Sequence, residues 1–284
     1  MQKKLYALLL VGAALAVPVG FAWALRVAPP PGPARVTGSD LVFIGKVTEI
    51  EPAELDVKQF PGAKNTVKYK IAVIKITDAI RGVKEVKSVR VGFIAPAPRQ
   101  PGVPIIGGGR GGPALQVGQE GLFMLKMHAS GQFYDAPDFG YFTPAAQQNF
   151  ADEVKTARKV VAIINNTKGA LESKENEERM IAASLLIGKY RQRQGAGPFR
   201  EEPIDAAESK LILNALANAN WKVTRYGDPN PYQLFTQLGV TAKDGWNQPK
   251  KIKSQDDLRN AVQAWIRDKG DSYRIKRWVA QNEK

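Results

Sequence analysis

The sequence predicts an α+β fold, in which a β-rich half is followed by an all-α half. From Asp40 to about Pro137, short runs alternate apolar and polar residues, which is typical of strands with one buried face. After Pro144, apolar residues recur with the spacing of amphipathic helices. The chain contains no cysteine, so buried apolar surface has to stabilise both parts. We therefore expect a β domain over residues 39–144 and a helical domain over residues 145–284.

Residues 1–24 follow the pattern of a secretory signal peptide. Two lysines precede the apolar stretch from Leu5 to Val17, and Ala22-Trp23-Ala24 provides small residues at the spacing that a signal peptidase needs. We expect cleavage after Ala24. The mature protein would then be extracytoplasmic, either secreted or periplasmic.

The alternative is an uncleaved anchor, because Leu5 to Leu25 is long enough to cross a bilayer. Pro18 and Gly20 interrupt a spanning helix and favour cleavage. Contact with a membrane is expected only if this segment stays in place, since no cysteine follows it for lipid attachment. With or without cleavage, the proline-rich residues 25–38 would form an extended linker.

Five strands are expected before Pro144, without helical segments between them. This pattern predicts a small antiparallel barrel or sandwich. Gly45 lies inside the first strand and predicts a bulge or bend there. The expected strands span Leu41–Ile50, Val67–Ile80, Val86–Ile94, Leu122–Met127 and Gln132–Asp135.

The third and fourth expected strands are joined by a proline- and glycine-rich loop. Its centre, Gly107 to Gly112, resembles a phosphate-binding loop in composition. A P-loop ends in Gly-Lys-Ser/Thr and opens a helix, whereas this run holds Arg110 and is followed by Pro113. We expect no nucleotide binding and keep Arg110 as a candidate contact for another anion.

The second half predicts four main helices and two short ones. Asp205 and Ser254 are expected to cap two of them, and Glu208 would complete a capping box with Asp205. The resulting unit would be a helical bundle or a degenerate helical repeat. The main helices would begin near Phe150, Glu177, Asp205 and Ser254, and the short pieces would span Tyr232–Leu238 and Tyr273–Val279.

Four tryptophans lie in this helical half. Core packing is the expected role of each, because such rings bury large areas. The alternative is that an exposed pair forms a recognition surface. The four are Trp221, Trp246, Trp265 and Trp278.

The residues that carry catalysis or bind metals are sparse. His128 is the only histidine, and no Gly-x-Ser-x-Gly segment offers a nucleophile to pair with it. One imidazole cannot supply the ligand set of a zinc site. The pairs Glu177-Glu178 and Glu201-Glu202 are expected to be solvated charges. We therefore expect no enzyme activity, no cofactor and no metal.

Three segments of the β-rich half together resemble the netrin-like domain of the tissue inhibitors of metalloproteinases. They are Ser39–Val47, Tyr69–Val73 continuing to Gly82, and Val117–Leu125. The resemblance covers about Ser39 to Asp135. It implies a five-stranded OB-like β-barrel and an extracellular binding role. The inhibitors chelate the protease zinc through an amino-terminal cysteine, which this chain lacks, so that mechanism is not implied here.

The leading functional hypothesis is an exported, non-enzymatic binding protein with a protein or acidic polymer as its partner. The formal net charge of +14 favours polyanions. The alternative is binding of nucleic acid or acidic glycan by the barrel face, through Lys68, Lys70 and Lys75. Tyr69 would point away from Lys68 and Lys70 on a regular strand. A carboxylate-based envelope hydrolase is a third hypothesis, and the sequence leaves the oligomeric state open.

Overall fold

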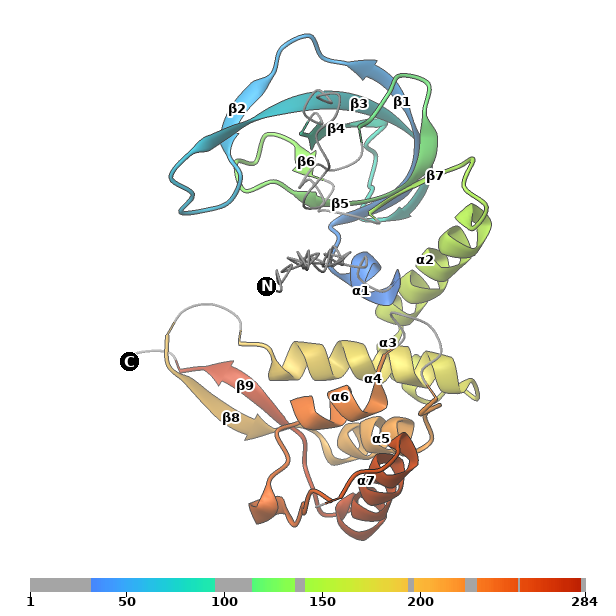
Figure 1. Cartoon of the computed structure of the whole chain (residues 1–284), viewed down its shortest axis with the longest axis vertical. Coiled ribbons are helices and arrows are strands. Elements are labelled where there is room, and N and C mark those ends of the chain that lie inside the picture. Colours follow the sequence, from blue (N-terminus) through green and yellow to red (C-terminus); the bar gives the residue numbers. More distant parts are fainter. Residues whose placement is uncertain are drawn as a thin grey trace, which may run out of the picture.

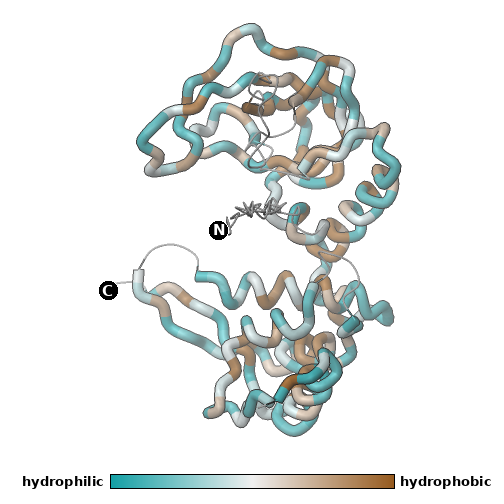
Figure 2. The backbone as a smooth tube through the Cα atoms, in the orientation of Figure 1, coloured by the Kyte–Doolittle hydropathy of each residue, from teal (hydrophilic) through white to brown (hydrophobic). Residues whose placement is uncertain are grey.

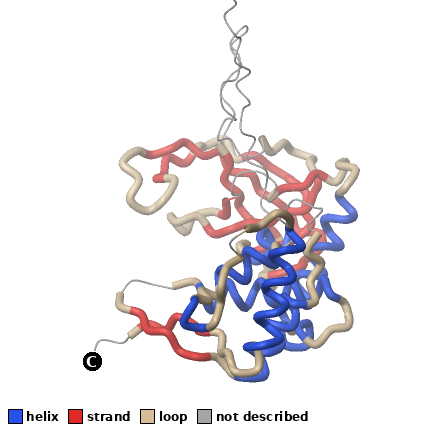
Figure 3. The backbone as a smooth tube through the Cα atoms, turned by 60° about the horizontal axis from the view of Figure 1, so that its bottom comes forward, coloured by secondary structure: helices blue, strands red, loops and turns tan. Residues whose placement is uncertain are grey.

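The computed structural model describes residues 32–94, 114–135, 141–193, 197–222, 229–249 and 251–281. This part of the chain is a mixed α+β protein with seven α-helices and nine strands. Strands β1 to β7 gather in one half and most helices in the other (Figure 1, Figure 3). The predicted signal peptide and the glycine-rich loop with Arg110 lie outside the described residues.

The first seven strands form one sheet whose pairings return to their starting point. The order is β1-β3-β4-β6-β5, and β5 pairs again with β1. Strand β2 is added to β3, and β7 is added to β5. The strands span β1 (Leu41–Ile50), β2 (Leu55–Lys58), β3 (Thr66–Arg81), β4 (Ser88–Phe93), β5 (Glu120–Met127), β6 (Tyr134–Asp135) and β7 (Phe142–Pro144).

The expectation of a wholly antiparallel sheet is wrong. Strands β4 and β6 run parallel, with Val91 paired to Tyr134 and Gly92 paired to Asp135. The cause is the odd number of strands in the cycle. Five strands that pair in a closed cycle cannot alternate direction at every step, so at least one neighbouring pair must be parallel.

The expected irregularity at Gly45 is confirmed. The register between β1 and β3 shifts between Ile44 and Gly45. A Cβ at position 45 would overlap the Ile74 side chain and the Lys75 carbonyl, so only glycine allows β3 to come this close.

Both faces of β1 and β5 are covered, which explains their almost continuous apolar runs. One face carries Phe43, Phe123 and Leu125 in a core enclosed by the cycle of strands. The other face carries Val42 and Met124, and packs against helices α1 (Gly32–Thr37) and α2 (Phe150–Asn165). Residues 32–37 were expected to be an extended linker. A helix can begin there because Pro33 has no N–H that a first turn would leave unsatisfied.

The four main helices expected after Pro144 are confirmed, and so is the short helix near Tyr232. The Asp205 carboxylate accepts a hydrogen bond from the Glu208 N–H, and Ser254 forms a full capping box with Asp257. The Glu208 carboxylate instead accepts a hydrogen bond from the Tyr190 hydroxyl. The helices are α3 (Thr167–Leu171), α4 (Asn176–Arg191), α5 (Ala206–Ala217), α6 (Pro231–Gln237), α7 (Gln255–Lys269) and the 3-10 turn η1 (Ala242–Asp244).

The second half is not all-α as expected. Strands β8 (Phe199–Pro203) and β9 (Lys276–Ala280) form an antiparallel two-stranded sheet, which we call the ribbon. A short helix was expected over Tyr273–Val279, but most of this segment is strand. Its β-branched and aromatic residues are typical of strands, and its backbone groups find partners in β8, which lies far away in the sequence.

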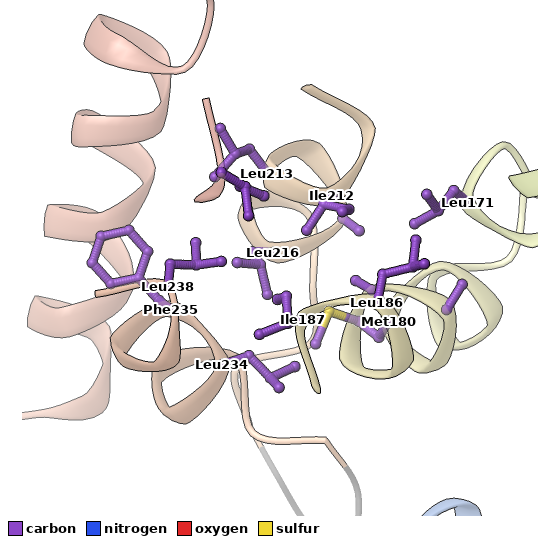
Figure 4. Packing of buried hydrophobic residues seen from close by; sticks show 14 of the residues in the cluster. Leu171, Met180, Leu186, Ile187, Ile212, Leu213, Leu216, Leu234, Phe235 and Leu238 are labelled. Carbon is purple, nitrogen blue, oxygen red and sulfur yellow. The ribbon is translucent and has the colours of Figure 1, made fainter. Parts of the chain in front are cut away.

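One apolar core joins helices α3 to α7. Figure 4 shows Leu186 and Ile187 of α4 meeting Ile212 and Leu216 of α5, with Phe235 of α6 beside them. Apolar segments concentrate in the interior of both halves (Figure 2). Helix α2 links the halves, because its apolar face packs on the sheet while Lys159 forms a 2.8 Å ion pair with Glu177 of α4.

Candidate functional site

The lysines predicted from the sequence do not form one patch. All three lie on β3, which is regular between them along its pairing with β4. Alternation therefore places Lys68 and Lys70 on one face and Lys75 on the other. Lys68 lies opposite Asp56 of β2, whereas Lys75 lies opposite Lys46 of β1. Arg110 lies outside the described residues.

His128 is buried, with 5% of its surface exposed. Its ring stacks on Phe133 at 4.4 Å and meets the edge of Tyr69. Its Nδ1 accepts a hydrogen bond from the Ser130 N–H, which the neutral ring can do and the protonated ring cannot. Burial lowers the pKa of His128, and the nearby Gln59 carbonyl opposes part of this effect. The histidine is a packing residue of the sheet.

The described ranges hold no close cluster of metal ligands and no helix suited to cross a bilayer. No three His, Asp or Glu residues there gather closely enough to hold a metal ion. None of the helices that the structure describes combines the length and the apolar character needed to cross a bilayer.

Trp278 differs from the other three tryptophans of the helical half. Trp221 and Trp265 are buried in the core, and Trp246 packs against it. Trp278 is half-buried on β9 and lies beneath two arginines. The Arg193 guanidinium carbon is 4.3 Å from the Trp278 ring centroid, and that of Arg191 is 5.2 Å away.

Arg191 and Arg193 have different environments although they are close in sequence. Arg191 ends helix α4, forms a 2.9 Å ion pair with Glu201, and donates hydrogen bonds to two backbone carbonyls. Arg193 is exposed and has no carboxylate partner within the described residues. Its guanidinium is held by ring contacts with Trp278 and, at 5.9 Å, Phe199. The aromatic rings thus position a cation that no carboxylate of the described residues neutralises.

The ribbon around this stack carries an excess of positive charge. Its two carboxylates, Glu201 and Glu202, are each shared by two basic side chains. Hydrogen bonds from Arg277 and Arg200 lower the pKa of Glu202, so this carboxylate stays ionised. Five basic residues surround the two acids, namely Arg191, Arg193, Arg200, Lys276 and Arg277.

Strand β8 has one open edge. The Pro198 carbonyl accepts a hydrogen bond from the Gln281 N–H, and the Ile204 N–H donates one to the Ile275 carbonyl. The even-numbered residues of β8 therefore form the backbone hydrogen bonds to β9. The N–H groups of Phe199 and Glu201 therefore point to the other side. No backbone partner for them occurs in the described part of the chain. The opposite edge of the ribbon faces helix α4, where Arg191 binds the Lys276 carbonyl.

The sequence matches no protein-family model, and comparisons with curated proteins and with solved structures give no significant match. The resemblance to the netrin-like domain therefore stays a prediction.

Sequence reasoning missed this surface. Phe199 and Trp278 are both half-buried, but they come from segments about 80 residues apart in the chain, and only the pairing of β8 with β9 brings them to one end of α4. One signal was the alternative that exposed tryptophans form a recognition surface. The other was Arg191-Gln192-Arg193 at the predicted end of a helix, which by itself is typical of ordinary complementation of the helix dipole.

Proposed function

We propose that this chain is an extracytoplasmic, non-enzymatic binding protein that uses the ribbon to hold an anionic partner. The observation that carries the proposal is the cation of Arg193, which is exposed, stacked on Trp278 and without a carboxylate partner in the described residues. Arginine and tryptophan are the residues that contribute most to binding energy in interfaces. The signal-like residues 1–24 support the extracytoplasmic location.

We interpret the cycle of strands β1, β3, β4, β6 and β5 as an OB-like barrel. The order of the pairings and the single parallel pair, β4 with β6, support this interpretation. Its enclosed core, including the stacked rings of Phe43 and Phe123, makes it a rigid support. In this proposal the barrel and α2 support the helical half, and the ribbon contacts the anionic partner.

Binding of defined polyanions to the purified full chain tests the proposal. Polyglutamate and dextran sulfate should bind at low salt and weaken as salt is added, because exposed charges are screened. Neutral dextran should not bind. Replacing Arg193 by Gln should weaken binding about tenfold, the loss expected for one charge-assisted contact.

The control variant is Lys155→Gln. Lys155 is exposed on α2, the helix that packs on the β1–β7 sheet, and its replacement removes the same formal charge. Equal losses for the two variants would show that net charge alone drives binding, and the ribbon would then be rejected as the contact surface.

A further inference from the structure

We propose that the partner is an acidic, extended peptide segment that adds as a third strand at the open edge of β8. This inference rests on the proposed function and names the partner of the same surface. Strand addition at a sheet edge takes its affinity from main-chain hydrogen bonds and its selectivity from alternate side chains. The edge N–H and carbonyl groups of Phe199 and Glu201 offer the main-chain hydrogen bonds. The arginines on either face of the ribbon offer the selectivity.

The charges on the two faces of the ribbon fit an acidic strand. Residues directly opposite in the ladder share a face, so Glu201 and Trp278 lie on one side, while Glu202 and Arg277 lie on the other. Arg193, which has no carboxylate partner in the described residues, adds its charge to the first face. Arg200 lies on the second face, where it shares Glu202 with Arg277. Carboxylates on either face of an added strand would therefore find basic neighbours.

A single-stranded nucleic acid fits the surface less well. Such ligands stack their bases on free aromatic faces. On the ribbon, guanidinium groups already lie over Trp278 and Phe199. The regular donors and acceptors along the β8 edge also match a peptide backbone and have no counterpart in a phosphodiester chain.

A second copy of β8 is disfavoured as the occupant. Antiparallel self-pairing centred on Glu201 would place two carboxylates opposite each other, which offsets part of the gain from the two Arg200–Glu202 pairs that the same register would form. Pro203 would also contribute no donor. Because β8 has five residues, the partner segment that it can pair with is of similar length.

The test measures binding of fluorescent peptides to the full chain by anisotropy. The probe is acetyl-(Glu-Val)₄-amide, compared with acetyl-(Gln-Val)₄-amide and with two versions of the probe that are N-methylated at every Glu or at every Val. The acidic probe should bind, the neutral peptide should bind about tenfold more weakly, and at least one methylated version should lose about tenfold. N-methylation removes edge donors without changing charge.

A matched pair of protein variants tests the same edge from the other side. Glu201→Pro and Glu201→Thr both remove the carboxylate, but only proline removes the outward N–H of position 201. Glu201→Thr should bind the acidic probe at least as well as the native chain, and Glu201→Pro should bind it about tenfold more weakly than Glu201→Thr. The peptide series keeps the test decisive if Glu201→Pro fails to fold.

The possible results separate the two proposals. If both methylated peptides bind like the parent, strand addition is wrong and the charged ribbon still stands as a contact surface. Binding of dextran sulfate or oligo(dT) without binding of the acidic peptide has the same meaning. If neither peptides nor polyanions bind, the proposed function fails as well. If the native chain self-associates and Glu201→Pro abolishes this self-association, the occupant of the β8 edge is a second copy of the chain and the peptide proposal is wrong.

Discussion

The guanidinium of Arg35 on α1 donates a 2.6 Å hydrogen bond to the carboxylate of Glu153 in the first turn of α2. The Arg35 side chain is 7% exposed and that of Glu153 is 23% exposed, so the pair is largely shielded from water. It fixes α1 to α2, and together these helices cover the outer face of β1 and β5. Breaking the pair should therefore loosen the cover of the sheet.

Glu153→Ala should lower the free energy of unfolding by about 2 kcal/mol, between the values for exposed and for buried ion pairs. The control is Asp152→Ala, which removes an exposed carboxylate from the same helical turn and should change stability by about 0.5 kcal/mol or less. Urea unfolding of both variants measures the difference. Equal effects would show that the charge at the helix start matters and the pair with Arg35 does not.

Two glycine-to-alanine changes should alter the stability of the fold in opposite directions. At Gly92 in β4, a Cβ would overlap the buried ring of Phe133, so Gly92→Ala should destabilise by about 1–3 kcal/mol. At Gly188 in α4, a Cβ would meet no atom within 4 Å, so Gly188→Ala should stabilise by about 0.5–1 kcal/mol. Thermal unfolding of the two variants provides the measurement. Stabilisation by Gly92→Ala would contradict the packing of Phe133 over β4.

Acid should destabilise the sheet through His128. Burial lowers the pKa of this ring in the folded chain below its ordinary value of 6.5, so the unfolded chain binds the proton more readily. The contribution of His128 to stability is complete above that value and is lost as the pH falls through the folded pKa. Because the chain has one histidine, its NMR titration gives the folded pKa directly. A midpoint above 6.5 would contradict the buried, neutral ring.

The predicted signal peptide implies a definite mature chain. If residues 1–24 are a signal peptide, intact mass spectrometry of protein from the producing cell should give a chain that begins at Leu25. Replacing Ala24 by a bulky residue such as Phe should block this cleavage. Recovery of the native sequence with Met1 in the membrane fraction would support the uncleaved anchor instead.

The expectations that were confirmed rest on local patterns. The helix caps at Asp205 and Ser254 involve residues three positions apart, and the bulge at Gly45 needs only a glycine inside a strand pattern. Such signals are complete within one turn or one strand. The burial of Trp221 and Trp265 also follows from their size and their helical surroundings.

The candidate site could not be predicted from the sequence, for a physical reason. Arg193 follows α4, while Trp278 lies on β9, near the carboxyl end. Their contact depends on the ladder between β8 and β9, and the helix predicted over Tyr273–Val279 gave no sign of that ladder. The arrangement of the β3 lysines, in contrast, is a local property. Their even and odd positions on one strand already imply that Lys75 faces away from Lys68.

By itself, the sequence determined a cysteine-free, basic chain with a β-rich half before a helical half, because composition and hydrophobic period are properties of local segments. Only the tertiary structure decided how the strands close. The odd number of strands in the cycle requires at least one parallel pair, and only the fold shows that this pair is β4 with β6, at Val91 and Tyr134. It also decided where Arg193 lies, because long-range hydrogen bonds between β8 and β9 bring together residues that are distant in the chain.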